Sequence, residues 1–177
     1  MENDVVERNC SATAIAPHVL LTAAHCYLPL AQEVRVDGAA ISFKLEKKIL
    51  DGKDHMLLVL PEANFTSFAE YYPASYREPY QGEHVYMWGN PLMDGHLYHD
   101  QYREGYVSGT DDEPFGNEKA NVVWYLLAFP GSGGDSGSAV YDEDGRLVTV
   151  ITYGISGKFM GGYPLAFTQE QVVEAEK

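Results

Sequence analysis

Short runs of β-branched and aromatic residues, each ended by Gly, Pro, Asn or Asp, follow one another along almost the whole chain. This pattern is typical of short strands joined by tight turns, as in an all-β sandwich or barrel. Pairs of Asp and Gly mark several of the turns, at Asp37-Gly38, Asp51-Gly52, Asp94-Gly95 and Asp144-Gly145. The pattern therefore predicts an all-β fold.

The same pattern locates the individual elements. A connection without strands is expected over Phe65–Gln81, which holds Pro73 and Pro79 and shows no clear alternation. One short helix is expected at the end of the chain, where Thr168 can cap it. The predicted strands are Ser11–Ile15, Val19–Thr22, Glu33–Val36, Ile41–Glu46, Met56–Leu60, His84–Trp88, Tyr106–Ser108, Val122–Leu127, Ser138–Tyr141, Leu147–Tyr153 and Tyr163–Thr168.

Charge limits the partners of the chain. Its 177 residues include 12 Lys+Arg and 26 Asp+Glu, which gives a formal net charge of −14. Polyanions bind basic surfaces that release counterions, so we expect neither nucleic acid nor a membrane surface as a partner. No apolar run reaches the ~18–20 residues that a membrane-spanning helix needs. The acidic start Met1–Asp4 is unlike a secretory signal, which leaves an intracellular chain and a mature piece of a longer precursor as open alternatives.

A histidine follows the apolar segment that begins at Leu20. The segment ends in small residues and then places His25 beside Cys26. Small neighbours would let the imidazole lie in a cleft with little steric obstruction. On its own, a histidine after an apolar run is more often structural than catalytic, so the assignment needs support from elsewhere in the chain.

That support comes from Gly131–Ser138, in which glycines surround Ser136. Glycines weaken a strand or a helix, but they suit a tight loop whose amides converge on one point. An acyl-transfer enzyme needs this arrangement, because the amides of Gly134 and Ser136 can donate hydrogen bonds to a developing oxyanion. A flexible glycine-rich linker is the alternative interpretation.

An aspartate stands at the head of the next apolar run. Asp54 begins the segment Asp-His-Met-Leu-Leu-Val-Leu that ends at Leu60. A carboxylate there can fix the tautomer of a histidine and stabilise the imidazolium that forms during proton transfer. Asp51 competes for this role, but Asp54 is favoured because it lies next to the apolar run.

Taken together, these segments resemble the chymotrypsin-like (trypsin-fold, PA clan) serine peptidases. Thr22–Cys26 resembles the histidine motif of that family, the segment from Asp54 its aspartate motif, and Gly134–Gly137 its serine motif, in the family's order. The short spacings are more similar to HtrA-like bacterial and viral proteases than to digestive enzymes. The resemblance implies a serine endopeptidase with the catalytic residues His25, Asp54 and Ser136 and an oxyanion hole formed by Gly134 and Ser136.

The resemblance also implies a fold. It consists of two antiparallel six-stranded β-barrels with the active site between them, followed by a short C-terminal helix. Residues 1–70 would form the first barrel, 71–82 the connection, and 83–177 the second barrel with the helix. The step of 16 residues from Cys10 to Cys26 matches the disulfide that clamps the histidine loop in this family. The 13 tyrosines are expected to fill the barrel interiors and the interface between them.

One family feature is expected to differ. In trypsin-like zymogens a newly exposed N-terminal amine pairs with the aspartate beside the nucleophile. Here only nine residues precede Cys10, and an Ile-Val-Gly-Gly start is missing. We therefore expect Asp135 to have another partner and the enzyme to need no amine insertion.

By resemblance, the base of the primary specificity pocket falls at Pro130. Its walls would come from Thr152, Tyr153 and Gly154 and from the chain around Gly162. Since Pro130 carries no charge that could select Lys or Arg, the resemblance implies an uncharged, apolar or aromatic P1 residue. Lys158 lies between the two walls, so a preference for an acidic P1 residue stays open.

The expected partner is a protein or peptide substrate, and no cofactor is expected. We also expect no metal, although His96 and His99 lie close to Asp100, because zinc sites usually have three or four convergent ligands. The alternative function is a catalytically silent, protease-shaped binding or regulatory module. The sequence does not predict the oligomeric state.

Overall fold

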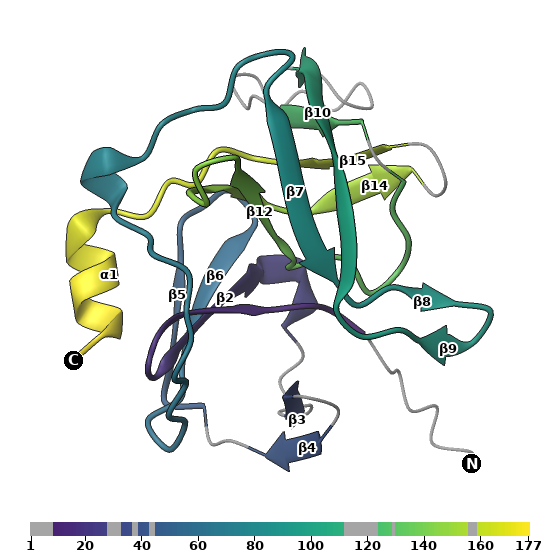
Figure 1. Ribbon diagram of the computed structural model, residues 1–177. Coiled ribbons are helices and arrows are strands. Elements are labelled where there is room, and N and C mark those ends of the chain that lie inside the picture. The colour runs from purple at the N-terminus through teal and green to yellow at the C-terminus, as the bar shows by residue number, and fades with distance from the viewer. Residues whose placement is uncertain are drawn as a thin grey trace.

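The computed structural model describes residues 9–27, 33–36, 39–42, 45–111, 124–128, 130–155 and 159–177 (Figure 1). Strands are the main regular elements of the described residues, with few helical turns, which confirms the predicted β class. The described part of the chain contains no helix with the length and apolar character that crossing a bilayer requires.

A four-stranded antiparallel sheet forms the first half of the fold, in the order β1-β2-β6-β5. One of its two inner strands, β2, is buried along its whole length, because alternate side chains enter two different clusters. Leu21 packs into the main core, whereas Leu20 contacts Leu60 on the other face. The strands are β1 (Thr13–Ala16), β2 (Val19–Ala23), β5 (Lys47–Leu50) and β6 (His55–Val59).

A seven-stranded sheet forms the second half, in the order β13-β12-β7-β10-β11-β15-β14. Its two long strands, β7 and β10, stand side by side in Figure 1 and are paired from end to end of β7. The strands are β7 (His84–Gly89), β10 (Gln101–Asp111), β11 (Trp124–Leu127), β12 (Ala139–Asp142), β13 (Leu147–Val150), β14 (Tyr153–Ile155) and β15 (Phe159–Gly162).

The remaining elements are small. Two hairpins stand apart from the sheets, and two single turns of 3-10 helix lie in connections. The second hairpin turns at Asp94 and Gly95, whose φ values of 50° and 76° are the left-handed pair that the sequence predicts for this turn. These elements are β3 (Glu33–Val36) with β4 (Ala39–Ser42), β8 (Leu92–Met93) with β9 (His96–Leu97), η1 (Ala24–Cys26) and η2 (Pro73–Ser75).

The predicted closed, six-stranded barrels are not confirmed. The sheets hold four and seven strands within the described residues, and β3 and β4 pair only with each other. In the second sheet, β10 changes its partner from β7 to β11 near an irregularity between Val107 and Gly109, which lets one strand serve both neighbours. A single bridge between Thr149 and Pro164, and not a continuous ladder, links β13 to the chain that follows β15.

The predicted strands agree with most of the observed ones, with ends shifted by a few residues. Four observed strands, β5, β8, β9 and β15, are not among the predicted ones, and in β5 two lysines hide the alternation. The predicted strand Leu147–Tyr153 is divided into β13 and β14, and Tyr163–Thr168 contains only the bridge at Pro164. The predicted turn at Asp37-Gly38 lies outside the described residues.

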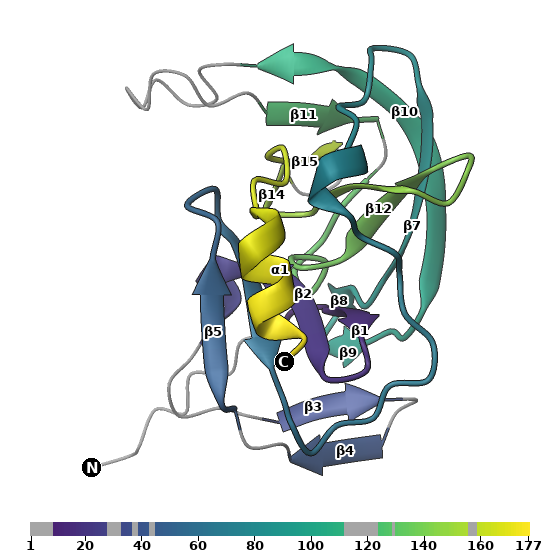
Figure 2. The ribbon, with the colours of Figure 1, turned by 90° about the vertical axis from the view of Figure 1, so that its left-hand side faces the viewer.

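The C-terminal helix forms as predicted and packs on the first sheet. α1 (Gln169–Ala175) begins at Thr168 with a reciprocal capping box. The Gln171 amide donates to the Thr168 hydroxyl over 3.2 Å, and the Gln171 side chain accepts from the Thr168 amide over 2.9 Å. Figure 2 shows the helix lying beside β5. The end of the chain therefore returns to cover the sheet formed by its beginning.

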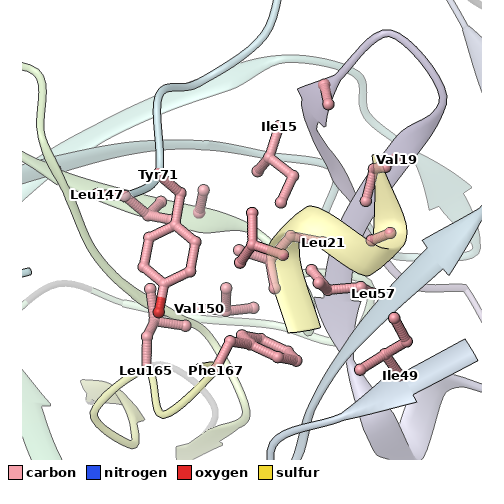
Figure 3. Close-up of a cluster of buried hydrophobic side chains, with 14 of the residues drawn as sticks. Ile15, Val19, Leu21, Ile49, Leu57, Tyr71, Leu147, Val150, Leu165 and Phe167 are labelled. Atoms are coloured by element: carbon pink, nitrogen blue, oxygen red, sulfur yellow. The ribbon is translucent and has the colours of Figure 1, made fainter. Parts of the chain in front are cut away.

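The main core joins the two halves. Val19, Leu21 and Leu57 from the first sheet meet Val150 and residues of the C-terminal segment in one buried cluster (Figure 3). Burying such side chains contributes about 1.5–3 kcal/mol each relative to leaving them exposed. This shared cluster fixes the two sheets relative to each other. The other labelled members in Figure 3 are Ile15, Ile49, Tyr71, Leu147, Leu165 and Phe167.

The expectation that the tyrosines fill the interior is wrong for several of them. Tyr102 is 51% exposed and lies opposite Trp88, which is 49% exposed, with ring centroids 5.5 Å apart. Alternation along β7 and β10 places these rings on the outer face of the sheet. Tyr72, Tyr80, Tyr98 and Tyr106 are exposed as well.

Candidate active site

Strand pairing brings His25 and Asp54 together. His25 lies in η1, directly after β2, and Asp54 directly precedes β6. The antiparallel register sets Ala23 at the end of β2 opposite His55 at the start of β6, so both residues emerge at the same sheet edge. The Asp54 carboxylate accepts from Nδ1 of His25 over 2.7 Å and from the backbone amide of His25 over 2.9 Å.

Asp54 adopts an uncommon backbone conformation to make these contacts. Its φ is 68°, in the left-handed region that Asp tolerates better than most residues. Its carbonyl oxygen accepts from the amide of Ala24 over 2.8 Å, which adds a third bond between the two segments. The side chains of His25 and Asp54 are 41% and 30% exposed, so the pair opens to solvent.

The competing residue Asp51 points elsewhere. Its side chain is fully buried and lies 2.6 Å from Nδ1 of a different histidine, His55. Asp54, as favoured from the sequence, is therefore the aspartate bonded to His25.

The disulfide between Cys10 and Cys26 is present, with Cα atoms 6.1 Å apart, as the family resemblance implied. Its sulfurs and a ring nitrogen of His25 lie within 4.8 Å of one another. Sγ of Cys26 also lies 3.8 Å from the carbonyl oxygen of Ser136. The disulfide thus lies close to both His25 and the backbone of Ser136. Because both sulfurs are bonded to each other, they offer no thiolate to a metal.

Ser11, next to Cys10, supports the loop that carries Ser136. Its amide donates to the carbonyl oxygen of Ser136 over 2.7 Å, and its buried hydroxyl donates to the carbonyl oxygen of Gly134 over 2.9 Å. The same hydroxyl accepts from the side-chain amide of Asn90 over 3.0 Å. The chain beside the disulfide therefore holds the loop at two carbonyls.

Gly134 occupies a position that only glycine fits. Its φ is 92°, and a Cβ there would collide with the carbonyl oxygen of Asn90. The carbonyl oxygen of Gly133 accepts from the amide of Leu92 over 2.6 Å. In a trans peptide the C=O and N–H groups point in opposite directions, so the N–H of Gly134 points away from Leu92.

The amides of this loop divide into two groups. Those of Asp135, Gly137 and Ser138 donate to backbone carbonyls over 3.3, 2.7 and 2.9 Å. The amides of Gly134 and Ser136 donate to no acceptor within the part of the chain that the structure describes. Two free amides on either side of one residue can bind a negatively charged oxygen.

Asp135 is paired with Arg103, which confirms the expectation of another partner. Asp135 is 1% exposed, and both of its oxygens accept from the two terminal nitrogens of Arg103, one of them over 2.7 Å. Asp135 also accepts from the amide of Ser132 over 2.9 Å. The sequence analysis missed Arg103, although its alternation with Tyr102 and Glu104 marks it as the inward-facing residue.

The predicted pocket residues lie in two segments that meet at Met160. Pro130 is exposed, and its carbonyl oxygen accepts from Arg103 over 3.2 Å. A Cβ on the adjacent Gly131 would overlap the Met160 side chain, and a Cβ on Gly154 would lie 3.4 Å from it. Met160, which the sequence analysis missed, is thus flanked by both segments.

The other predicted wall residues belong to the β14–β15 region. The amide of Thr152 donates to Gly161 over 3.0 Å, and Tyr153 pairs with the same residue across the hairpin. Gly162 is buried, and a Cβ there would collide with the carbonyl oxygen of Val150. Thr152, Tyr153 and Gly154 therefore form one continuous segment that pairs with β15. Gly162 lies in the packed part of the sheet.

Comparisons with known proteins agree with this fold. A family model described as a trypsin-like peptidase domain matches residues 10–150. The structure is similar to the Rv3671c protease of M. tuberculosis, in an inactive form (TM-score 0.67, 14% identity, 94% of this chain and 80% of that chain). The active form of that protease is similar to the same degree (TM-score 0.66, 14% identity, 94% and 73%).

Human heparin binding protein is also similar, with a TM-score of 0.64 and 18% identity over 94% of this chain and 87% of that chain. At such identities the likeness concerns the fold. No curated protein sequence matches the chain.

Proposed function

The chain belongs to the trypsin-like peptidase domain family, and on this premise we propose that it is a serine endopeptidase acting through Ser136. The observation that carries the proposal is the hydrogen bond between His25 and Asp54. This pair lies beside the disulfide that contacts the backbone of Ser136. A histidine oriented by a carboxylate next to a serine is the arrangement that activates a hydroxyl nucleophile.

The proposed reaction assigns one task to each group. The Ser136 hydroxyl attacks the scissile carbonyl, and His25 takes its proton on Nε2, because Nδ1 is engaged by Asp54. Asp54 stabilises the imidazolium, and the free amides of Gly134 and Ser136 bind the oxyanion. His25 then gives the proton to the leaving amine, and water hydrolyses the acyl-enzyme in a second cycle of the same steps.

The proposal assigns the catalytic groups to two parts of the chain. Residues 1–70 supply the histidine and the aspartate, and residues 83–177 supply the serine and the oxyanion amides. Residues 71–82 connect the two parts. A peptide substrate bound between them would contact groups from both.

For the P1 residue we propose an uncharged, apolar or aromatic side chain. Pro130 is uncharged, and the segment after it packs with Gly154 against the thioether of Met160. An apolar surface of this kind would leave a charged P1 group without a partner. Lys158, which would favour an acidic P1 residue, lies outside the described residues.

The alternative is a catalytically silent binding module, and the likeness to heparin binding protein is the observation that favours it. The net charge of −14 argues against a polyanionic ligand of that type for this chain. The presence of all three reactive side chains supports the peptidase.

Covalent labelling separates the two functions. The wild-type protein should form a one-to-one adduct with a serine-reactive phosphonate, whereas Ser136→Ala should form none. If the wild type stays unlabelled, or if Ser136→Ala labels equally, the peptidase proposal is wrong. Cleavage of a peptide library by unlabelled wild-type protein from the same preparation should then favour apolar or aromatic P1 residues over Lys and Arg.

A further inference from the structure

A second histidine–aspartate pair lies in the same loop as Asp54 and takes part in no step of the proposed reaction. Nδ1 of His55 is 2.6 Å from Oδ2 of Asp51, and Nδ1 of His25 is 2.7 Å from Oδ2 of Asp54. The two pairs differ in exposure. The side chains of Asp51 and His55 are 0% exposed, whereas those of His25 and Asp54 open to solvent.

The Asp51 carboxylate accepts four hydrogen bonds. Oδ1 accepts from the amides of Lys53 and His55 over 2.7 and 3.2 Å. Oδ2 accepts from the His55 ring over 2.6 Å and from the amide of Ala166 over 3.1 Å. Burial opposes ionisation, but these bonds outweigh it and hold the pKa of Asp51 below its ordinary value.

The two amides bound by Oδ1 lie on either side of Asp54. Asp51 therefore fixes Lys53 and His55, the residues that flank the left-handed position with φ of 68°. A non-glycine residue keeps such a conformation only where its surroundings determine it. The orientation of the Asp54 carboxylate toward His25 thus depends on the carboxylate of Asp51.

The bonds to Oδ2 tie the same loop to the C-terminal segment. Ala166 belongs to the chain that enters α1, and the side chain of Gln171 donates to the carbonyl oxygen of Leu50 over 3.0 Å. The His55 ring packs against the rings of Tyr163 and Phe167, with centroids 6.5 and 6.4 Å away. The loop that carries Asp54 is therefore held by the part of the chain that follows Ser136.

The His55 ring has one engaged nitrogen. Its Nε2 is buried and has no hydrogen-bond partner among the described residues, so the ring proton lies on Nδ1 and is donated to Asp51. Two phenols also lie near the pair, those of Tyr71 and Tyr163, whose pKa values are both raised by burial. The pair is thus a ring N–H donating to a buried carboxylate, with the rings of Tyr163 and Phe167 packed around it.

We propose that Asp51 and His55 are positioning residues, which hold Asp54 in the orientation that the catalytic histidine requires. The inference rests on the proposed function, since it gives the buried pair a role in the same active site. Neither residue would contact the substrate. Their loss should therefore lower kcat and leave KM nearly unchanged.

Three variants test this role. Asp51→Asn replaces one carboxylate oxygen, which accepts two hydrogen bonds, by an NH2 group that can accept none. His55→Leu removes the ring N–H that donates to Asp51. Each should lower kcat by about 10- to 100-fold, as a displacement of roughly 1 Å at a reacting group does, with KM within about twofold of wild type. His55→Asn keeps a donor near the position of Nδ1 and should recover most of the loss. His84→Leu, on the far sheet, is the matched control and should keep wild-type kcat.

A second measurement does not depend on activity. The Nδ1 proton of His25, observed by NMR in the isotope-labelled ring, should show the downfield shift of its bond to Asp54 in the wild type and in His55→Asn. The shift should be lost in Asp51→Asn and His55→Leu. Thermal unfolding of every variant shows whether it is folded at the assay temperature.

The outcomes are distinct. Folded Asp51→Asn or His55→Leu protein with wild-type kcat and an unchanged His25 signal would overturn the inference, as would equal loss in His55→Asn and His55→Leu. If only one of the Asp51 and His55 variants folds, that variant and His55→Asn still decide it. If the phosphonate does not react with the wild type but the NMR changes occur as expected, the proposed function is refuted and the positioning role stands.

Discussion

Arg103 forms a bidentate ion pair with Asp135, the residue that precedes Ser136. The carboxylate is 1% exposed and the guanidinium 17% exposed, so the pair is largely desolvated. The same guanidinium donates to the carbonyl oxygen of Pro130, at the start of the loop. Because Arg103 belongs to β10, the loop is held by a fixed side chain within the described structure, and we predict that no new N-terminal amine is needed for activity.

Replacing Arg103 by Ala should disable the loop. Removing one partner of a buried ion pair costs about 3–5 kcal/mol, because the other charge stays buried without compensation. We expect lower stability and slower phosphonate labelling of Ser136. Labelling rates and urea unfolding measure the two effects. Arg146→Ala, which removes a 58% exposed guanidinium, is the control. Unchanged labelling in Arg103→Ala would contradict the assigned role.

Replacing Gly134 by Ala should affect the reaction more than binding. A Cβ would collide with the carbonyl oxygen of Asn90 and turn the Gly134 amide from its present direction. Loss of one oxyanion donor lowers kcat by about 100-fold. Gly95→Ala is a matched control, since Gly95 also has a positive φ but no atom within 4 Å of a Cβ. Steady-state kinetics should separate the two variants, and equal kcat values would argue against the oxyanion role.

Replacing Ser11 by Ala should loosen the same loop more mildly. The hydroxyl links Asn90 to the carbonyl oxygen of Gly134, and a buried polar group left unpaired costs about 1–3 kcal/mol. If about 1.4 kcal/mol of this cost is added to the activation free energy of the reaction, kcat falls tenfold. Ser75→Ala, at an exposed turn, serves as the comparison. A Ser11→Ala enzyme as fast as the wild type would exclude this contribution.

Reduction of the disulfide should destabilise the protein. Cys10 and Cys26 close a loop with a sequence separation of 16, and a crosslink of about that length contributes about 3 kcal/mol by restricting the unfolded chain. We expect a lower melting temperature and slower labelling of Ser136 in the presence of a reductant. The chain has no other cysteine, so the double variant Cys10→Ser and Cys26→Ser should not respond to the reductant at all.

Stability should depend on pH through Asp51. The folded-state pKa of Asp51 lies below the unfolded value of 3.8, so the ionised carboxylate stabilises the fold above about pH 4. This contribution is lost as the pH falls through the lower, folded-state pKa. Asp51→Asn should therefore be less stable than wild type at pH 7, and the difference should shrink below pH 4. Urea unfolding at both pH values measures it; a constant difference would disagree with the linkage.

Local patterns in the sequence were sufficient for features that need only neighbouring residues. The turn at Asp94 and Gly95 and the cap at Thr168 depend on the backbone preferences of a few adjacent residues. The family motifs gave the likeness to trypsin-like peptidases and the cysteine pair. Most strands followed from alternation, but β5, β8, β9 and β15 were not predicted, and only a short part of β10 was.

Only the tertiary structure decided which distant groups meet. Asp51 and Asp54 lie three residues apart, and their partners are set by the amide of Ala166, far along the chain, and by the left-handed turn at Asp54. The pairing of Arg103 with Asp135 and the open order of the two sheets depend in the same way on contacts between segments that no local pattern relates. The sequence by itself determined the chemical groups and their local conformations, whereas long-range packing selected their partners.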